Sequence, residues 1–268
     1  AKGQRNPPLA LLLDDLGVHF DATQPSRLEQ RIAEPLGSEQ GKRARLLQGL
    51  WCDLRLSKLN PAQESPPPNE PFVLVVDQSA GDCSIALGLA GPRCFQQMLR
   101  EALRDHPDCT VVVKVHPDVI RGRARGHFRR RDLQHPRIHL CADGLHPAAL
   151  LEQARAVYVV TSQMGFEALL WGKPVHCFGM PFYAGWGLTR DRLPAPARRR
   201  AGVALEALVH AALVAGTRCV DPHRHRRCSI EELMQAIGLQ RQLQRSTPGR
   251  VEAFGFTPWK QKSLRRFL

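Results

Sequence analysis

The chain has 268 residues, of which 43% are hydrophobic and 24% are charged, a balance typical of a folded globular protein. The apolar run Leu9 to Leu13 is too short to span a membrane and has no signal-peptide pattern. The eight cysteines are scattered and form no CxxC pair. These features exclude a membrane-spanning or disulfide-framed protein and favour a reducing, cytoplasmic location.

The net charge of +13 comes mainly from arginine, in the segments Arg121 to Arg131 and Arg198 to Arg200 and in the tail Lys260 to Arg266. Basic surfaces attract anionic lipid, acidic ligands and nucleic acid by the same electrostatics. Few aromatic residues interleave with these arginines, so nucleic acid is the least favoured partner. An anionic membrane surface or an acidic ligand is favoured, and a plain solvated basic face is the alternative.

Residues 1–68 are predicted to form an N-terminal segment that carries one long helix over Ser38 to Leu56. A shorter helix is expected to begin after Ser26, because Ser26 and Glu29 have the spacing of a capping box. The tract Asn60 to Pro71 is rich in proline, which blocks both helices and strand ladders, and is interpreted as a linker.

From Phe72 onward, apolar strands alternate with helices, which predicts a doubly wound parallel α/β sheet of Rossmann type over residues 69–200. The expected strands are FVLVVD, TVVVKVHP, RIHLCAD, AVYVVTS and PVHCFG, and the expected helices cover Cys94–Asp105, His146–Ala154 and Gly165–Trp171. Residues 201–268 are predicted to be mostly helical, with helices over Leu205–Ala215 and Ile230–Gln244, the second beginning at Ser229 with Glu232 three residues on.

In a doubly wound sheet, ligands bind beyond the carboxyl ends of the strands. The residues at those ends are Asp77, Asp82, Lys114, His116, Pro117, Thr161, Ser162 and Gln163. Cations and hydroxyl groups suit a phosphate, and a carboxylate can act as a nucleophile or a base. The plain alternatives are that His116 only ends a strand, that Lys114 is exposed, and that Ser162 and Asp82 only cap helices.

Two other segments contain residues that could bind a ligand or a metal ion. The loop GMPFYAGWG sets Phe182, Tyr183 and Trp186 among glycines, a composition that favours a loop covering a ligand. Cysteines and histidines between Cys219 and Cys228 match no zinc-finger spacing, and the arginines among them oppose a cation, so an ordinary loop is predicted. The absence of GxxxxGK[ST], GxGxxG and GxSxG patterns disfavours a P-loop NTPase, a dinucleotide oxidoreductase and an elbow-type hydrolase.

Four phrases carry a resemblance to a known family: GVHFDATQPSRLE, VVDQSAGDCSI, VKVHPDV and VYVVTSQMGFEALLWGKPVHCFGMPFYAGWGLT. They resemble the capsular polysaccharide β-Kdo transferases of the KpsC type, which build the keto-deoxy-octulosonate (Kdo) linker of bacterial capsules. The similarity runs from about Leu12 to the end of the chain. Small departures, such as Ser79 for Thr and Val115 for Thr, remove no charged group.

The resemblance implies a retaining glycosyltransferase of GT-B architecture that uses CMP-β-Kdo without a metal or cofactor. His-Pro and Ser/Thr motifs hold the CMP phosphate in the wider group, and they correspond to His116-Pro117 and Thr161-Ser162. Retention implies a carboxylate nucleophile, for which Asp82 is the first candidate and Asp77 the second. The substrate-binding candidates are Lys114, His116, Pro117, Thr161, Ser162, Gln163, Glu167 and Tyr183.

The implied partners are CMP-Kdo, a lipid-linked Kdo acceptor, the anionic lipid of the inner membrane, where the protein would be peripheral, and other capsule assembly proteins. Family members carry a further Rossmann domain upstream of the phrase GVHFDAT, and nothing before Asp14 matches it. The chain is therefore expected to be a CMP-sugar-binding domain with a partial acceptor-side segment before it. The alternatives are a catalytically incomplete nucleotide-sugar-binding module and a sialyltransferase-like enzyme with another CMP-sugar donor.

Overall fold

The computed structural model describes residues 9–58, 60, 63–142 and 145–246. Its centre is a six-stranded sheet of order β4-β3-β2-β5-β6-β7, in which all neighbouring strands are parallel. The strands are β2 (Phe72–Val76), β3 (Thr110–Lys114), β4 (Ile138–Cys141), β5 (Val157–Val159), β6 (Val175–Cys177) and β7 (Arg190–Asp191). The predicted parallel α/β class is confirmed, and the short β7 is an addition to it.

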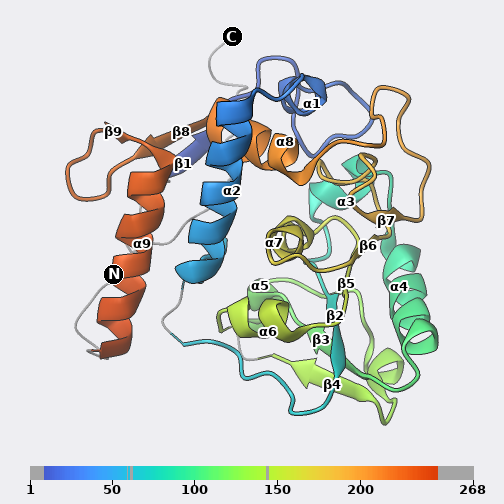
Figure 1. The fold of residues 1–268 in the computed structure, drawn as a ribbon. Coiled ribbons are helices and arrows are strands. Elements are labelled where there is room, and N and C mark those ends of the chain that lie inside the picture. Colours follow the sequence, from blue (N-terminus) through green and yellow to red (C-terminus); the bar gives the residue numbers. More distant parts are fainter. Residues whose placement is uncertain (1–8, 59, 61–62, 143–144, 247–268) are drawn as a thin grey trace.

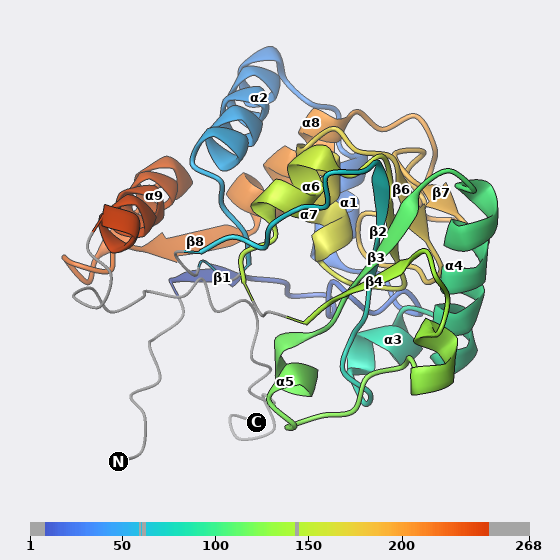
Figure 2. The same ribbon diagram turned by 90° about the horizontal axis from the view of Figure 1, so that it is seen from below.

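The strand order reverses between β2 and β5. From β2 the chain winds outward through β3 and β4, then returns to β5 on the other side of β2 and continues to β6 and β7. The loops that follow β2 and β5 therefore lead in opposite directions and leave a crevice between them. Figure 2 shows α3 (Cys83–Leu87), which follows β2, and α5 (Pro117–Ile120), which follows β3, at the same end of the sheet.

Strand β2 contributes to a hydrophobic cluster on each face of the sheet, because successive side chains of a strand point to opposite faces. Val73 and Val75 pack in a cluster with α4 (Pro92–Asp105). Phe72, Leu74 and Val76 pack in the larger cluster on the other face. That face is covered by α6 (Ala148–Gln153) and α7 (Met164–Leu170), as Figure 1 shows. The sheet is thus buried on both faces.

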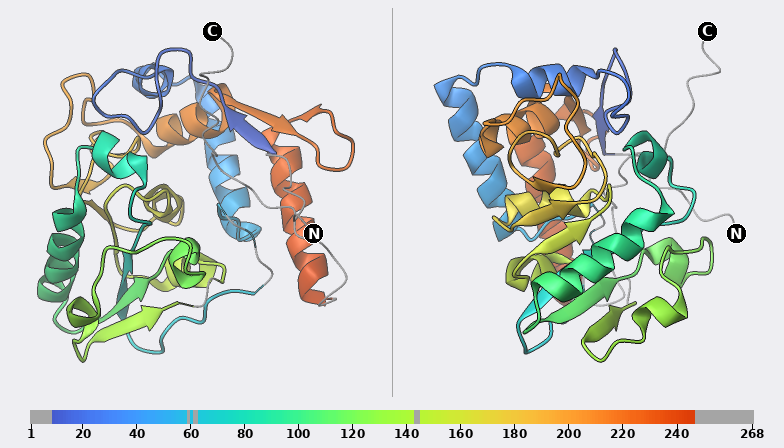
Figure 3. Two further views of the ribbon diagram at one scale, coloured as in Figure 1. Left: turned by 180° about the vertical axis from the view of Figure 1, so that it is seen from behind. Right: turned by 90° about the vertical axis from the view of Figure 1, so that its right-hand side faces the viewer.

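A second layer lies beyond α7 (Figures 1 and 3). Its helices are α1 (Arg27–Ala33), α2 (Ser38–Asp53), α8 (Leu205–His210) and α9 (Ile230–Ser246). Its strands are β1 (Ala10–Leu12), β8 (Thr217–Val220) and β9 (Arg227–Cys228), which form an antiparallel sheet of order β1-β8-β9. α2 packs against both α8 and α7, so this layer is joined to the central sheet through α7.

Local signals at helix ends are confirmed. Ser26 accepts a hydrogen bond from the Glu29 N–H, and the Glu29 carboxylate accepts one from the Ser26 N–H, so the predicted capping box is present. Ser229 and Glu232 form the same pair of bonds before α9. The long helix begins at Ser38 as predicted and ends at Asp53, slightly before the predicted end.

Two predictions for the flanking regions need correction. The described residues of the proline-rich tract are not a detached linker. Asn60 and Ser65 are buried, and the backbone of Glu64 forms an isolated parallel β-bridge with His146 beside α6. The region after residue 200 holds the β8–β9 hairpin as well as the predicted helices. The hairpin pairs with β1, a partner about 200 residues away in the sequence that no local pattern could indicate.

The larger cluster contains residues from all three predicted segments, among them Leu47, Phe166 and Leu208. The boundaries at residues 68 and 200 remain predictions, and the core crosses both of them. None of the described helices is both long and apolar enough to cross a membrane. The basic tail Lys260 to Arg266 lies outside the described residues.

Candidate functional site

A pocket opens at the carboxyl ends of β2, β3 and β5, where the strand order reverses. We call it the switch-point pocket. Its lining residues are Ser57, Lys58, Val76, Asp77, Lys114, Val115, His116, Leu145, Pro147, Ser162, Gln163, Met164 and Glu167. Six of the ten predicted site residues thus line one pocket. Ser57 and Lys58, from the connection after α2, were not predicted.

Asp77 directly follows β2 and is held in one position by the backbone around it. Its Oδ1 accepts hydrogen bonds from the N–H groups of Gln78 (2.9 Å) and His127 (3.1 Å). Gly126 passes so close that an added Cβ would lie 2.2 Å from Oδ2 of Asp77. Burial raises the pKa of Asp77, and these backbone bonds partly oppose the shift. The pocket therefore contains a fixed, only 4% exposed carboxyl group.

Asp82 has different surroundings. It is exposed and caps α3, where its Oδ1 accepts a hydrogen bond from the Ser84 N–H at 2.9 Å. It is absent from the pocket lining. Its Oδ2 also accepts a hydrogen bond from Gln78 Nε2 at 3.3 Å, so Asp82 acts as a helix cap and as a partner of Gln78.

Thr161 belongs to a small polar network behind the pocket. Its hydroxyl contacts Gln78 Nε2 at 3.0 Å and Ser84 Oγ at 3.1 Å, and its N–H donates to Gln78 Oε1 at 2.9 Å. This network joins the end of β5 to the loop after β2 and the start of α3. Thr161 is thus engaged with neighbouring residues, whereas Ser162 and Gln163 line the pocket.

His116 presents a defined tautomer to the pocket. Its Nδ1 accepts the Asp118 N–H at 3.1 Å and lies 3.0 Å from Ser79 Oγ. Because Nδ1 is an acceptor, the proton of the neutral ring is on Nε2. Burial lowers the pKa of His116, which favours this neutral form. His116 can therefore donate a hydrogen bond through Nε2–H. Pro117, the next residue, begins α5.

Lys114 is a buried cation at the end of β3. Its ammonium donates to Ser65 Oγ at 2.9 Å and contacts Cys141 Sγ at 3.5 Å. Ser65 comes from the proline-rich tract, so that tract supports the site directly. Such bonds compensate for part of the cost of removing the ammonium from water.

Glu167 is a buried acid of α7 that lines the same pocket. Its Oε1 accepts the Lys58 N–H at 3.1 Å, whereas its Oε2 has no hydrogen-bond partner within the described structure. Burial raises the pKa of Glu167 to about 7, while Ser57 and Lys58 partly oppose the shift. A buried acceptor without a partner is costly, so Oε2 is suited to meet a donor group of a ligand.

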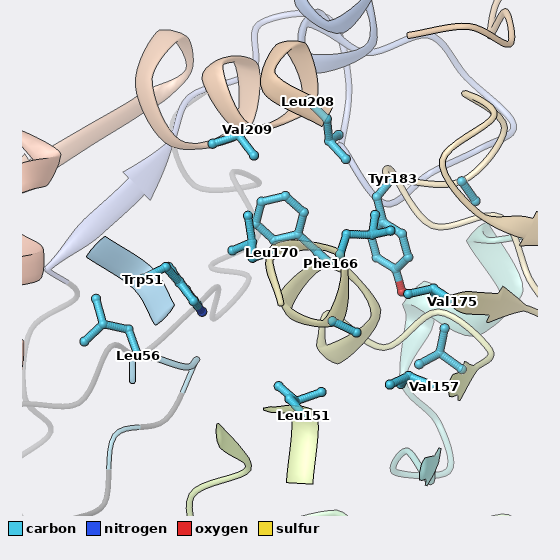
Figure 4. Packing of buried hydrophobic residues seen from close by; sticks show 14 of the residues in the cluster. Trp51, Leu56, Leu151, Val157, Phe166, Leu170, Val175, Tyr183, Leu208 and Val209 are labelled. Atoms are coloured by element: carbon cyan, nitrogen blue, oxygen red, sulfur yellow. The ribbon is translucent and has the colours of Figure 1, made fainter. Parts of the chain in front are cut away.

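The aromatic loop does not cover the pocket, and the prediction for Tyr183 as a cover is corrected here. Tyr183 and Trp186 are fully buried, and Figure 4 shows Tyr183 within the core near Phe166 and Leu208. The Tyr183 hydroxyl donates a short hydrogen bond to the Ser162 carbonyl, and the Trp186 indole N–H donates to Phe182 at 2.8 Å. The loop thus supports the pocket wall from behind.

A second, mainly apolar pocket lies between α7 and the outer layer, with His19, Trp51, Phe166 and Phe182 among its lining residues. Gln163 lines both pockets. Among the described residues, no group of three or more His, Cys, Asp or Glu side chains is arranged to hold a metal ion. Cys219 and Cys228 face each other across the β8–β9 hairpin.

The strand order and the pocket at its reversal define an α/β protein of the Rossmann type. The structure is similar to that of Thermosulfurimonas dismutans KpsC, beta Kdo 2,4 transferase, with a TM-score of 0.79 and 38% identity over 85% of this chain and 73% of that chain. The beta Kdo 2,7 transferase structure of the same protein matches with a TM-score of 0.69 and 30% identity, over 85% and 72%.

The family model for capsule polysaccharide biosynthesis proteins matches residues 29–218, and the chain belongs to this family. It is 37% identical over 277 residues to the capsule polysaccharide modification protein LipA of Neisseria meningitidis serogroup A, covering 98% of this chain and 39% of that protein. The lipopolysaccharide-processing protein LpsZ of Rhizobium meliloti is 37% identical over 201 residues, covering 72% and 46%. The chain thus spans less than half the length of these relatives. The predicted resemblance to the KpsC-type Kdo transferases is confirmed.

Proposed function

We propose that this chain binds CMP-β-Kdo in the switch-point pocket and serves in the transfer of Kdo, with retention, to a lipid-linked Kdo acceptor during capsule linker synthesis. The observation that carries the proposal is the pocket itself: it lies where doubly wound sheets bind nucleotides, in a chain similar to Kdo transferases. The pocket combines hydrogen-bond donors for a phosphate with a fixed carboxylate.

His116 is the principal phosphate ligand in this proposal. Its Nε2–H donates to a phosphate oxygen, and Ser162 adds a hydroxyl from the end of β5. Thr161 holds the Gln78 side chain in place behind them. A CMP-sugar has one phosphate and no pyrophosphate, so these donors act without a metal ion in the proposed site.

We favour Asp77 over Asp82 as the carboxylate that meets the sugar, reversing the order of the sequence-based candidates. Asp77 lines the pocket beside His116, whereas Asp82 caps α3 outside it. In the first displacement, an Asp77 oxygen bonds to the anomeric carbon as the bond from that carbon to the phosphate oxygen breaks and CMP leaves. In the second, the oxygen of an acceptor hydroxyl bonds to the anomeric carbon as the bond from that carbon to Asp77 breaks and the hydroxyl proton passes to solvent, which restores the original configuration.

The same proposal includes an acceptor side and a location. The exposed arginines between Arg121 and Arg131 follow α5, close to the pocket, and suit an acidic acceptor or an anionic membrane surface. The protein would then act in the cytoplasm, peripherally at the inner membrane. In a GT-B arrangement, residues 69–200 bind the CMP-sugar, residues 1–68 belong to the acceptor side, and residues 201–268 form the adjoining helical segment.

The test is binding of CMP and CMP-Kdo by calorimetry, together with transfer of Kdo to a synthetic Kdo-lipid. His116→Ala should weaken CMP binding at least about tenfold, because it removes a hydrogen bond to a charged group. Asp77→Asn should keep CMP binding and lose transfer, whereas Asp82→Asn should keep both. Loss of transfer in Asp82→Asn alone would restore Asp82 as the nucleophile.

Two other outcomes separate the alternatives. CMP-Kdo binding without transfer by the unmodified chain would identify a nucleotide-sugar-binding module. Tighter binding of CMP-sialic acid than of CMP-Kdo would identify a sialyltransferase-like donor preference. Absence of binding to every CMP compound would refute the proposal.

A further inference from the structure

Lys58 lines the switch-point pocket, and hydrogen bonds fix the backbone of its segment. The Ser57 N–H donates to Asn60 Oδ1 at 3.0 Å, and Asn60 Nδ2 donates back to the Ser57 carbonyl at 2.7 Å. Asn60 is buried and its Oδ1 also lies 3.3 Å from His146 Nε2. The Lys58 N–H donates to Glu167 at 3.1 Å. The backbone of Lys58 is therefore attached to the pocket wall, and Lys58 is one of the residues that line the cavity.

The Lys58 ammonium differs from the other basic groups of this pocket. Lys114 donates to Ser65 and Cys141, and His116 is held in a neutral tautomer. Lys58 is half-buried and, among the residues that the structure describes, has no acidic group within ion-pair distance. An ammonium in a partly desolvated pocket is stabilised by an anionic ligand.

The charge of Lys58 affects the pKa values of neighbouring groups, including two in the proposed site. Burial lowers the pKa of His116, and the Lys58 charge adds to that shift. Burial raises the pKa of Glu167, and the Lys58 charge partly opposes it. Lys58 also adds to the lowering of the pKa of His19 by burial. His116 follows β3 and Glu167 belongs to α7, so the Lys58 charge acts on pocket residues from two different elements.

A nucleotide-activated ulosonic acid carries two anionic groups on one carbon. The anomeric carbon bears both the phosphate oxygen and the sugar carboxylate, whereas an ordinary aldose nucleotide has only the phosphate there. A site that binds such a donor therefore needs a cationic ligand for the sugar carboxylate beside its phosphate ligand. Lys58 and His116 line one pocket and meet this requirement.

We infer that Lys58 binds the carboxylate of the donor sugar and so selects an ulosonic acid over sugars that lack a carboxylate at the anomeric carbon. This inference rests on the proposed function and adds to it a residue outside every motif of the sequence. The phosphate remains with His116, so the two anionic groups of the donor have separate ligands.

The experiment compares CMP, which has no sugar carboxylate, with CMP-Kdo, by calorimetry on the whole chain. In Lys58→Met, the affinity for CMP-Kdo should fall about tenfold to a hundredfold, the range for loss of a charged hydrogen bond, while that for CMP should change less than about twofold. Lys58→Arg should retain most of the affinity for CMP-Kdo. The matched control is Lys42→Met, a change of the same kind at an exposed lysine of α2 that pairs with Glu39.

Each outcome bears on the inference. Equal loss of CMP and CMP-Kdo affinity in Lys58→Met would assign Lys58 to the phosphate, and no loss of either would remove it from the site; both results overturn the inference while leaving the proposed function intact. Binding of neither ligand by the unmodified chain would overturn the proposed function and this inference together. Thermal unfolding of each variant verifies that it is folded, which we expect because the Lys58 backbone, not its side chain, holds Glu167.

Discussion

Asp77 and Asp82 are five residues apart in one loop, and the structure gives them different roles. The sequence places both near the carboxyl end of the first strand of the sheet, and nothing local distinguishes them. In the fold, Asp77 is fixed by the Gln78 and His127 N–H groups, the second of which is 50 residues away. Asp82 stays exposed at the start of α3. The difference comes from the return of a distant loop, which favours Asp77 as the reactive carboxylate.

Glu167 leads to a prediction about pH. Its pKa of about 7 lies above the ordinary value of 4.5, so the folded state favours the protonated form. The stability that this provides is complete below the unfolded pKa and is lost as the pH rises through about 7. Glu167→Gln should therefore raise the free energy of unfolding at about pH 8, by at most about 3 kcal/mol, and change it little at about pH 4.

Urea unfolding at the two pH values measures this effect. Glu152→Gln, a change at a largely exposed glutamate of α6, is the control. An equal effect of Glu167→Gln at both pH values would contradict the raised pKa that burial gives Glu167.

Helix α7 and the loop that follows β6 act together as a wall of the pocket. Gly165 allows the Tyr183 ring to pack against α7, because an added Cβ there would lie 2.3 Å from the Tyr183 hydroxyl. The hydroxyl in turn binds the Ser162 carbonyl. The aromatic residues of this loop therefore fix the end of β5 where Ser162 and Gln163 enter the pocket.

Tyr183→Phe should destabilise the protein by about 0.5–1.5 kcal/mol, because the Ser162 carbonyl loses the Tyr183 hydroxyl and keeps only the Gly165 N–H as a hydrogen-bond donor. The affinity for CMP-Kdo should change much less than in Lys58→Met, since Tyr183 is not part of the pocket lining. Chemical unfolding and calorimetry measure the two effects. A large loss of CMP-Kdo affinity at unchanged stability would instead support the original interpretation of Tyr183 as a cover.

A buried ion pair joins the first and last thirds of the described chain. Glu29 of α1 accepts from Arg198 at 2.7 Å and from Arg199 at 2.6 Å. The Arg199 side chain is fully buried and also donates to the carbonyls of Pro181 and Ala184. Arg199 thus connects α1 to the loop that supports the pocket.

Glu29→Gln should cost about 3–5 kcal/mol of unfolding free energy, because it leaves the Arg199 charge buried without its counter-ion. The effect should appear in urea unfolding monitored through the buried tryptophans Trp51 and Trp186. Glu34→Gln, at the exposed end of the same helix, is the matched control and should change stability by less than about 0.5 kcal/mol. Equal effects of the two changes would show that the ion pair contributes little.

Features that depend on local residue patterns could be predicted from the amino-acid sequence. Apolar runs located the five longer strands of the sheet, Ser26 and Ser229 marked helix starts, and the alternation of strands and helices established the parallel class. Because right-handed crossovers bring all strand carboxyl ends to one edge, the sequence also located Asp77, Lys114, His116 and Ser162 at a common site.

Features that depend on contacts between distant segments could not be predicted, because they arise only when the chain folds. Ser57 and Lys58 reach the pocket from a connection more than 100 residues before Glu167, Ser65 supports Lys114 from a tract that resembles a linker, and β1 pairs with β8 across the molecule. The burial of Tyr183 could not be predicted from the sequence for the same reason. Side-chain periodicity reports which face of an element is buried, but burial of a loop depends on what other parts of the chain pack over it.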